Sequence, residues 1–151
     1  MPNKKQPRPI WTLEKFKAPR RISAAEQRAI TASLRVFAGT KFDGGIPPGD
    51  PESAHLLRTI ETALNAAGWS MIDWSGGDLV YTDRGHPNAG LVSVSNVIIA
   101  AFPGQHSAIY AAAKALVENL NAADIAAQSQ DATGITNNTT DAVHILIGRK
   151  M

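Results

Sequence analysis

The sequence predicts an α/β fold of the α+β type, a two-layer sandwich in which helices cover one face of a mixed sheet. A helical run between Pro48-Gly49 and Leu64-Asn65-Ala66-Ala67 returns between Pro103-Gly104 and Leu120-Asn121-Ala122-Ala123. The offset is 55 residues at the start (48 to 103) and 56 at the end (64 to 120). An apolar, strand-like segment follows each copy. Two βαβ-like units of this kind form one sheet, ferredoxin-like or related, with right-handed crossovers.

A first helix is expected over residues 24–37, ahead of the two units. Ser23 and Glu26 fit a capping box, in which the hydroxyl accepts from a helical amide and the carboxylate reaches back to the cap. Apolar residues then recur at helical spacing as far as Phe37. Gly39 supplies the C-terminal stop.

The first unit is expected to hold a short strand at residues 41–46 and then a long helix. Gly and Pro residues between positions 44 and 49 predict the loop that joins them. Asp50 caps the helix, and Pro51 occupies its first position, where a missing amide costs nothing. Gly68 ends the helix. Its buried stripe consists of Leu56, Leu57, Ile60, Ala63, Leu64 and Ala67.

Strands and a loop are expected between the two helical runs. Residues 69–74 and 79–81 are expected to form strands, and residues 82–89 a loop. Residues 90–95 alternate in polarity, as a half-buried strand does. Residues 97–102 either continue that strand after a bulge or form a separate one, since the periodicity fits both.

The second unit is expected to repeat the helix and strand of the first. Apolar positions in residues 107–121 have helical spacing, and many alanines permit close packing on a sheet. Residues 125–128 are expected to form a strand, and residues 129–141, rich in Thr and Asn, a loop. Residues 142–147 are the clearest strand of the chain.

The composition is that of one globular domain with a basic N-terminal extension. The chain has 151 residues, 44% of them hydrophobic, and no cysteine, which excludes disulfides and thiol catalysis. No apolar run approaches the roughly 20 residues that a membrane-spanning helix needs. We therefore expect a Pro-rich arm at residues 1–21, with seven basic side chains against Glu14, and a single α/β domain at residues 22–151.

The arm is a candidate for contact with a polyanion, either nucleic acid or an anionic membrane surface. Its prolines remove backbone donors and oppose helix formation. The residues expected to contact phosphate groups are Lys4, Lys5, Arg8, Lys15, Lys17, Arg20 and Arg21. The alternative is a solubilising or docking arm that binds no polyanion.

Several motifs together resemble a family of uncharacterised bacterial proteins. They cover most of residues 20–150 and are Arg21-Ile22-Ser23 with Gln27, Phe37-Ala38-Gly39-Thr40 with Phe42-Asp43, Pro51-Glu52, Ala63-Leu64-Asn65-Ala66-Ala67-Gly68-Trp69 and Val143-His144-Ile145-Leu146-Ile147-Gly148-Arg149-Lys150. In that family a soluble domain of this kind often follows transmembrane or coiled segments, and no family activity carries over residue by residue. The resemblance implies a cytoplasmic domain, associated with a membrane where the native protein is longer.

The start of the second long helix is a candidate site for a small ligand. Free amides at a helix N-terminus, a hydroxyl and an imidazole together suit an anion. The residues that provide them are Gly104, Gln105, His106 and Ser107. The simpler interpretation is that Ser107 caps the helix and His106 is solvated. At the equivalent point of the first unit, Asp50 and Glu52 already occupy the positive helix end.

A second candidate is the polar loop that holds Asp83, Arg84 and His86. An aspartate and a histidine can act as an acid–base pair or as metal ligands. A turn rich in Gly, Pro and Asn explains the same residues, and no second ligand pair has suitable spacing, so we expect neither metal nor cofactor. His144 lies in an apolar strand, where a histidine is more often a core residue with one hydrogen bond than a catalyst.

The sequence as a whole favours a binding domain over an enzyme, because the apolar pattern is complete while polar functional groups are few and scattered. We expect a non-enzymatic domain that binds a protein partner, a second copy of itself or a small ligand within a larger bacterial assembly. The alternative is a small hydrolase or transferase that uses His86, Asp83 or His106 beside a cleft. Phosphate-loop and nucleophile-elbow motifs are absent from the sequence.

Overall fold

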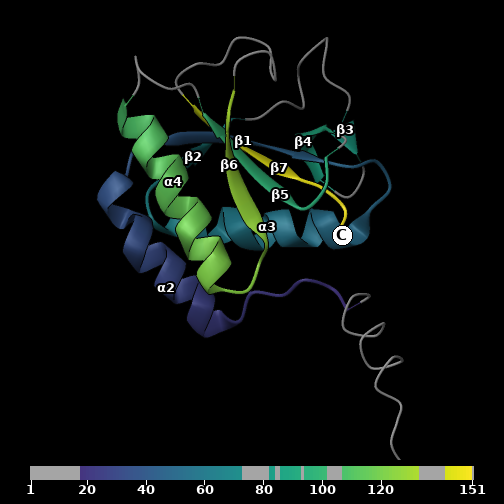
Figure 1. Ribbon diagram of the computed structural model, residues 1–151, viewed down its shortest axis with the longest axis horizontal. Coiled ribbons are helices and arrows are strands. Elements are labelled where there is room, and N and C mark those ends of the chain that lie inside the picture. The colour runs from purple at the N-terminus through teal and green to yellow at the C-terminus, as the bar shows by residue number, and fades with distance from the viewer. Residues whose placement is uncertain are drawn as a thin grey trace, which may run out of the picture.

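Four described strands lie in succession between the two long helices of the chain, and the strands join in a sheet (Figure 1). The computed structural model describes residues 18–72, 82–83, 86–92, 94–101, 107–132 and 142–150. The helices are α2 (Ala24–Leu34), the short 3-10 helix η1 (Arg35–Phe37), α3 (Pro51–Ala66) and α4 (Ser107–Ala122). The strands are β1 (Lys41–Ile46), β2 (Ser70–Met71), β3 (Thr82–Asp83), β4 (His86–Leu91), β5 (Val97–Ala101), β6 (Ala127–Asp131) and β7 (Ala142–Ile147).

The sheet is mixed, as the sequence predicts. Its described strands run in the order β3-β4-β1-β7-β5-β6, and β2 also pairs with β1. Strand β1 is parallel to β2, β4 and β7, and β5 is parallel to β6, whereas β5 and β7 are antiparallel. The α/β class expected from the sequence is therefore confirmed.

The two similar sequence units form two βαβ units of this sheet. The first consists of β1, α3 and β2, and the second of β5, α4 and β6. Helices α3 and α4 have 16 residues each and start at positions 51 and 107, which are 56 apart. The two strands of each unit pair directly with each other. A ferredoxin-like fold has split βαβ units instead, so that part of the expectation is not confirmed.

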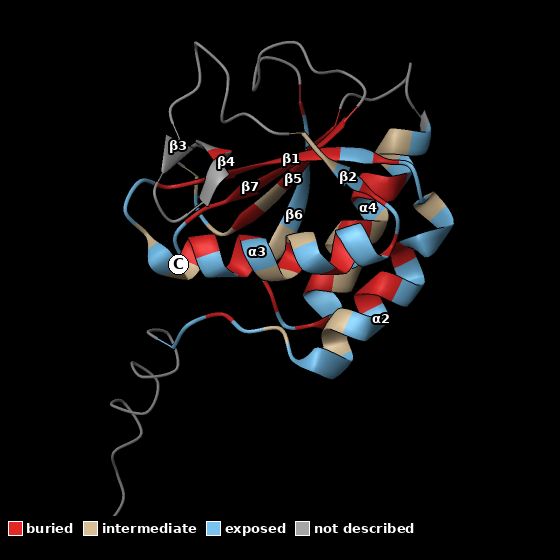
Figure 2. Ribbon diagram, turned by 180° about the vertical axis from the view of Figure 1, so that it is seen from behind, coloured by how far each residue is buried: buried red, intermediate tan, exposed pale blue. Residues whose placement is uncertain are grey.

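Helices α3 and α4 lie on the same side of the sheet in both views, and α2 packs against them (Figures 1 and 2). Alternate residues of β7, namely Val143, Ile145 and Ile147, belong to the buried cluster formed with the helices. Gly44 lets α3 approach β1 closely, because a Cβ atom there would lie 2.7 Å from Leu57 Cδ2. The main core therefore lies between the helices and the sheet.

Local sequence signals account for the helix boundaries. The Glu26 amide donates to Ser23 Oγ at 3.1 Å and the Ser23 amide donates to Glu26 Oε1 at 2.8 Å, which confirms the capping box. Gly68 follows α3 with φ at 92°, a conformation that glycine adopts without steric cost. Asp50 occupies the cap position of α3 but bonds no helical amide; its carboxylate accepts from the Ser53 hydroxyl at 2.6 Å.

The segment between the two units differs from the expectation. The loop expected at residues 82–89 is wrong, because β3 and most of β4 lie there and pair antiparallel. The strand expected at residues 90–95 is displaced towards the N-terminus, since β4 takes its register from β1, with Gly90 opposite Gly45. Strand β5 is separate from β4, which decides between the two alternatives for that segment. The strand expected at residues 79–81 lies outside the described residues.

Candidate functional site

A cleft of about 270 Å³ lies where the segment before α2 meets the end of β7 and the turn after α4. We call it the Arg20 cleft. Three cationic side chains, Arg20, Arg21 and Lys150, and one acidic side chain, Asp124, are among its lining residues. The other lining residues are Ala18, Pro19, Asn96, Ala123, Ile125 and Ala126.

The guanidinium of Arg20 ties three parts of the chain together from a buried position, with its side chain 5% exposed. Nε donates to Glu52 Oε2 at 2.9 Å and Nη2 donates to Glu52 Oε1 at 2.6 Å, which makes a bidentate ion pair. Nη2 also donates to the Gly148 carbonyl at 2.8 Å and to the Ser53 hydroxyl at 3.2 Å. The start of α3 and the end of β7 are therefore held to the segment before α2.

One nitrogen of Arg20 is left out of this network. Nη1 is buried and has no hydrogen-bond acceptor among the residues that the structure describes. Burial of a polar group without a partner costs about 1–3 kcal/mol, and more when the group is charged. Such groups are few in native proteins, and an ion is one of the explanations for them. An anion within reach of Nη1 would satisfy it.

Glu52 is the counterion of Arg20. Burial raises the pKa of the Glu52 carboxyl, but hydrogen bonds from the Arg20 side chain and amide, together with the charges of Arg20 and Lys150, outweigh burial and hold the pKa below its ordinary value of 4.5. Glu52 is therefore ionised at neutral pH and offsets the charge of Arg20. The charges that remain on the lining of the cleft are those of Arg21, Lys150 and Asp124.

Two residues on the lining have a left-handed backbone conformation, which residues other than glycine seldom adopt. Asn96 has φ at 58° and Asp124 has φ at 63°. The carbonyl of Asn96 accepts from the Gly148 amide at 2.6 Å, and its amide donates to the Arg149 carbonyl at 3.0 Å, so this loop is held against the end of β7. Residues in such conformations cost free energy and are enriched at ligand sites.

A second buried polar pair lies inside the sheet. Asp43 of β1 and His144 of β7 are opposite each other in the parallel register, with His144 Nδ1 2.7 Å from Asp43 Oδ1. The side chain of His144 is 0% exposed and that of Asp43 is 7% exposed. A carboxylate that orients an imidazole is an arrangement known from acid–base sites. Because this imidazole has no contact with solvent, we interpret the pair as a link between β1 and β7.

His144 is a buried residue with a hydrogen bond, as its place in an apolar strand predicts, but the sequence gives no sign of its partner. Asp43 lies 101 positions away in the chain. Only the pairing of β1 with β7 brings the two side chains together. No local motif signals a contact of this kind.

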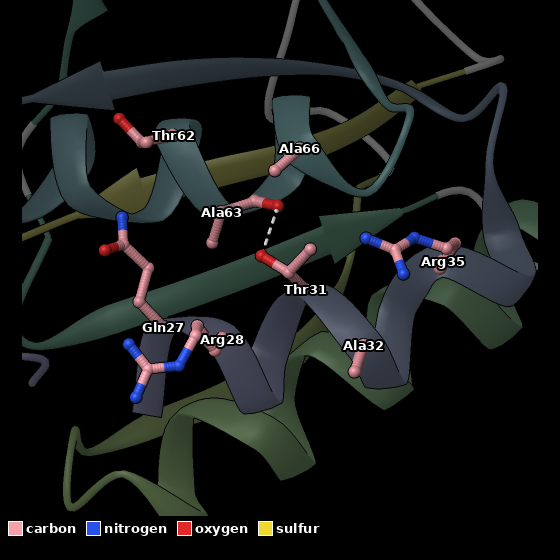
Figure 3. Close-up of a pocket in the computed structure, with 8 residues that line it drawn as sticks. All are labelled: Gln27, Arg28, Thr31, Ala32, Arg35, Thr62, Ala63 and Ala66. Atoms are coloured by element: carbon pink, nitrogen blue, oxygen red, sulfur yellow. Dashed lines mark hydrogen bonds between the residues drawn. The ribbon is translucent and has the colours of Figure 1, made fainter. Parts of the chain in front are cut away.

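A groove of about 400 Å³ lies between α2 and α3 (Figure 3). Figure 3 shows Arg28 of α2 and Arg35 of η1 towards opposite ends of the row of lining side chains. The Thr31 hydroxyl donates to the Ala63 carbonyl at 2.9 Å and so bridges the two helices. The lining residues are Gln27, Arg28, Thr31, Ala32, Arg35, Thr62, Ala63 and Ala66.

The two candidate sites predicted from the sequence are only partly within the described structure. Ser107 is the first residue of α4. Asp83 and His86 are direct partners in the antiparallel pairing of β3 with β4, so the backbone brings these two positions together. The candidates that lie outside the described residues are Gly104, Gln105, His106 and Arg84.

The basic arm differs from the expectation at Arg20. Its guanidinium is buried against Glu52, 32 positions downstream, so Arg20 packs against the domain instead of extending from it as part of an arm. The neighbouring Arg21 is exposed and lines the Arg20 cleft. The other cations of the arm lie outside the described residues: Lys4, Lys5, Arg8, Lys15 and Lys17. Contact with a polyanion stays a proposal for Arg21 and these five.

Comparisons with protein-family models, with curated proteins and with solved structures find no match. Within the described residues, no three His, Asp or Glu side chains come together as a metal-binding group. No helix in that part of the chain is long and apolar enough to cross a bilayer. The geometry of the clefts and polar clusters is therefore the basis for a proposal about function.

Proposed function

We propose that this protein is a non-enzymatic binding domain whose ligand is a small anion held in the Arg20 cleft. The observation that carries the proposal is that Arg20, whose buried Nη1 lacks an acceptor in the described structure, lines a cleft together with Arg21 and Lys150. A phosphate or carboxylate oxygen accepts charge-assisted hydrogen bonds from a guanidinium. Such a ligand completes the hydrogen bonding of Arg20 without displacing Glu52.

The size and chemistry of the cleft favour a small molecule over a polymer. Its volume of about 270 Å³ is close to the lower end of the usual range for ligand pockets. Asn96 and Asp124 add an amide and a carboxylate to the three cations of the lining. A ligand that carries a phosphate or carboxylate together with a hydroxyl or amino group matches this combination.

Titration of the intact chain with inorganic phosphate tests the proposal. Binding to the native state raises the melting temperature by mass action. We expect NMR amide shifts at residues 20–21, 124–126 and 149–150. Arg21→Ala and Lys150→Ala should each weaken binding by about threefold to tenfold, since each removes one exposed cation.

Lys114→Ala is the matched control, because Lys114 is an exposed cation on α4 that does not line the cleft. The control should bind phosphate as the wild type does. Equal weakening in all three variants would indicate nonspecific attraction of the anion and would contradict the proposal. An absence of shifts with phosphate, acetate and glycerol phosphate would contradict it as well.

A second candidate function is acid–base catalysis where β3 pairs with β4. It is favoured by one observation, the direct pairing of Asp83 with His86 across the two strands. A hydrolase or transferase that used this pair would lose turnover of ester or phosphoester substrates in His86→Ala. It would keep turnover in His55→Ala, which removes an exposed histidine of α3. The same background rate in both variants would exclude this function for the substrates used.

A further inference from the structure

We propose that the groove between α2 and α3 is a docking site for an acidic amphipathic helix of a protein partner (Figure 3). None of its lining residues also lines the Arg20 cleft, so this inference does not depend on the function proposed above. It follows from the shape of the groove, from the charges at its ends and from an apolar side chain beside it.

The floor of the groove suits the close approach of another helix. Ala32, Ala63 and Ala66 contribute small side chains. The polar groups between them already have partners inside the protein: the Thr31 hydroxyl donates to the Ala63 carbonyl at 2.9 Å, and Gln27 Nε2 donates to the Thr59 carbonyl at 3.1 Å. Apolar side chains can therefore pack there without competing for hydrogen bonds, as helices do in groove-binding complexes.

The charges of the groove select an acidic partner. Arg28 of α2 and Arg35 of η1 are seven positions apart, about 10 Å along a helix, and both are exposed. None of the eight lining residues is acidic. A partner helix with carboxylates at positions i and i+7 has the same spacing on one face, so it can pair with both arginines at once.

An exposed apolar residue follows the lining residue Arg35 in the chain. Val36, next to Arg35 in the chain, is 80% exposed and is the large hydrophobic side chain that the described structure leaves in solvent. A single exposed valine is ordinary by itself. Because it follows a lining residue of the groove, we expect it to add an apolar contact for the end of the docked helix.

The probe that tests the inference is a labelled synthetic peptide of about 15 residues, with Leu on one face and a Glu pair at i and i+7. Its fluorescence anisotropy is measured with the intact chain at physiological salt. A peptide with Lys in place of Glu is the control ligand and should not bind. We expect Arg28→Glu and Arg35→Glu each to weaken binding of the Glu peptide by about tenfold.

Lys114→Glu changes the net charge by the same amount but lies on α4, outside the groove, and should leave binding within about twofold. Ala66→Trp tests shape without changing charge. Ala66 is exposed, so the larger side chain fills the groove and leaves the core intact. This variant should bind the Glu peptide at least tenfold more weakly than the wild type does. Melting curves confirm that each variant is folded.

Four results would overturn the inference. The first is equal binding of the Glu peptide by the Arg28, Arg35 and Lys114 variants, and the second is unchanged binding by Ala66→Trp. The third is equal competition by an RNA oligonucleotide or by anionic vesicles, which would make the groove a general polyanion surface. A dimer of the intact chain that Arg28→Glu dissociates would replace the partner with a second copy and would also overturn it.

Discussion

The turns that end α3 and α4 have the same hydrogen bonding but different residues at the equivalent point. The Trp69 amide donates to the Leu64 carbonyl at 3.0 Å, and the Ile125 amide donates to the Leu120 carbonyl at 2.9 Å. In the first turn the left-handed position is a glycine, Gly68, with φ at 92°. In the second turn it is Asp124, with φ at 63°. Glycine has no steric cost in this conformation, whereas an L-residue does.

The difference between the turns coincides with the Arg20 cleft. Gly68 packs against Ala38, the residue that follows η1, because a Cβ atom on Gly68 would lie 2.9 Å from Ala38 Cβ. Asp124 is exposed and lines the cleft. A carboxylate at a helix C-terminus is also unfavourable in the field of the helix dipole. Residues that break a local rule are expected at functional sites, so the Asp124 turn, and not the Gly68 turn, is the one to test for ligand binding.

The largest effect is expected from removal of the Arg20 hydrogen-bond network. Arg20 and Asp124 line the same cleft. Arg20→Ala should lower the free energy of unfolding by about 2–4 kcal/mol. It leaves the Glu52 carboxylate, whose side chain is 25% exposed, and the Gly148 carbonyl without their shared donor. Urea denaturation measures the loss. Arg21→Ala, which removes an exposed arginine, is the control and should change stability by less than about 0.5 kcal/mol.

The next effect comes from making the first turn resemble the second. Gly68→Asp should destabilise the protein by about 2–3 kcal/mol in urea denaturation. The new side chain must adopt a left-handed backbone and displace Ala38. A loss below about 0.5 kcal/mol would mean that the two turns are interchangeable, and the comparison would then say nothing about function.

The reverse exchange should have a smaller effect of opposite sign. Asp124→Gly removes the left-handed strain and the unfavourable dipole interaction, so we expect a gain of about 0.5 kcal/mol after the added chain entropy of glycine. The same variant removes the acidic group from the cleft and should bind inorganic phosphate more tightly than the wild type. Thermal melting and phosphate titration measure both effects. A loss of stability would indicate that Asp124 has a structural partner.

The effect with the most specific pH dependence concerns Glu52. Its pKa is lower in the folded protein than the ordinary value of 4.5. Its contribution to stability is therefore complete above about pH 4.5 and is lost as the pH falls through the folded-state pKa. The stability difference between the wild type and Glu52→Gln should be constant from about pH 6 to 8 and should shrink in acid. A difference that stays constant down to about pH 3 would contradict the role of Arg20 in holding Glu52 ionised.

Local signals were sufficient to predict the helices but not all of the strands. The capping box at Ser23 and the glycine after α3 act within one turn of helix, so the sequence shows them directly. Strand β4 begins with His86, Pro87 and Asn88, a polar segment expected to be a loop, and it pairs with β3 at His86 and with β1 at Gly90 and Leu91. Strand β6 extends to Asp131 although most of it is polar and exposed, because β5 supplies its hydrogen bonds. Tertiary pairing overrides propensity in both cases.

The polar clusters could not be predicted, because their partners are remote in the chain. Arg20 lies in the basic segment that the sequence predicts to be an arm. Its pairing with Glu52 at the start of α3 holds it against the domain. Asp43 and His144 meet only when β1 and β7 lie side by side. The repeated sequence pattern around the two long helices did predict the two βαβ units of the sheet, because the repeat can be read directly from the sequence.

The position of β7 also has a consequence for how the protein is made. It is the last described strand along the chain, yet it lies between β1 and β5 and pairs Lys41 with Ala142. On the ribosome, β1 and β5 are synthesised before β7, the strand that joins them. Until β7 is present, their open edges can pair with other chains. Contacts between such distant segments slow folding. The domain should therefore acquire its final structure only after synthesis of β7, and a nascent chain that stalls before residue 142 should depend on chaperones.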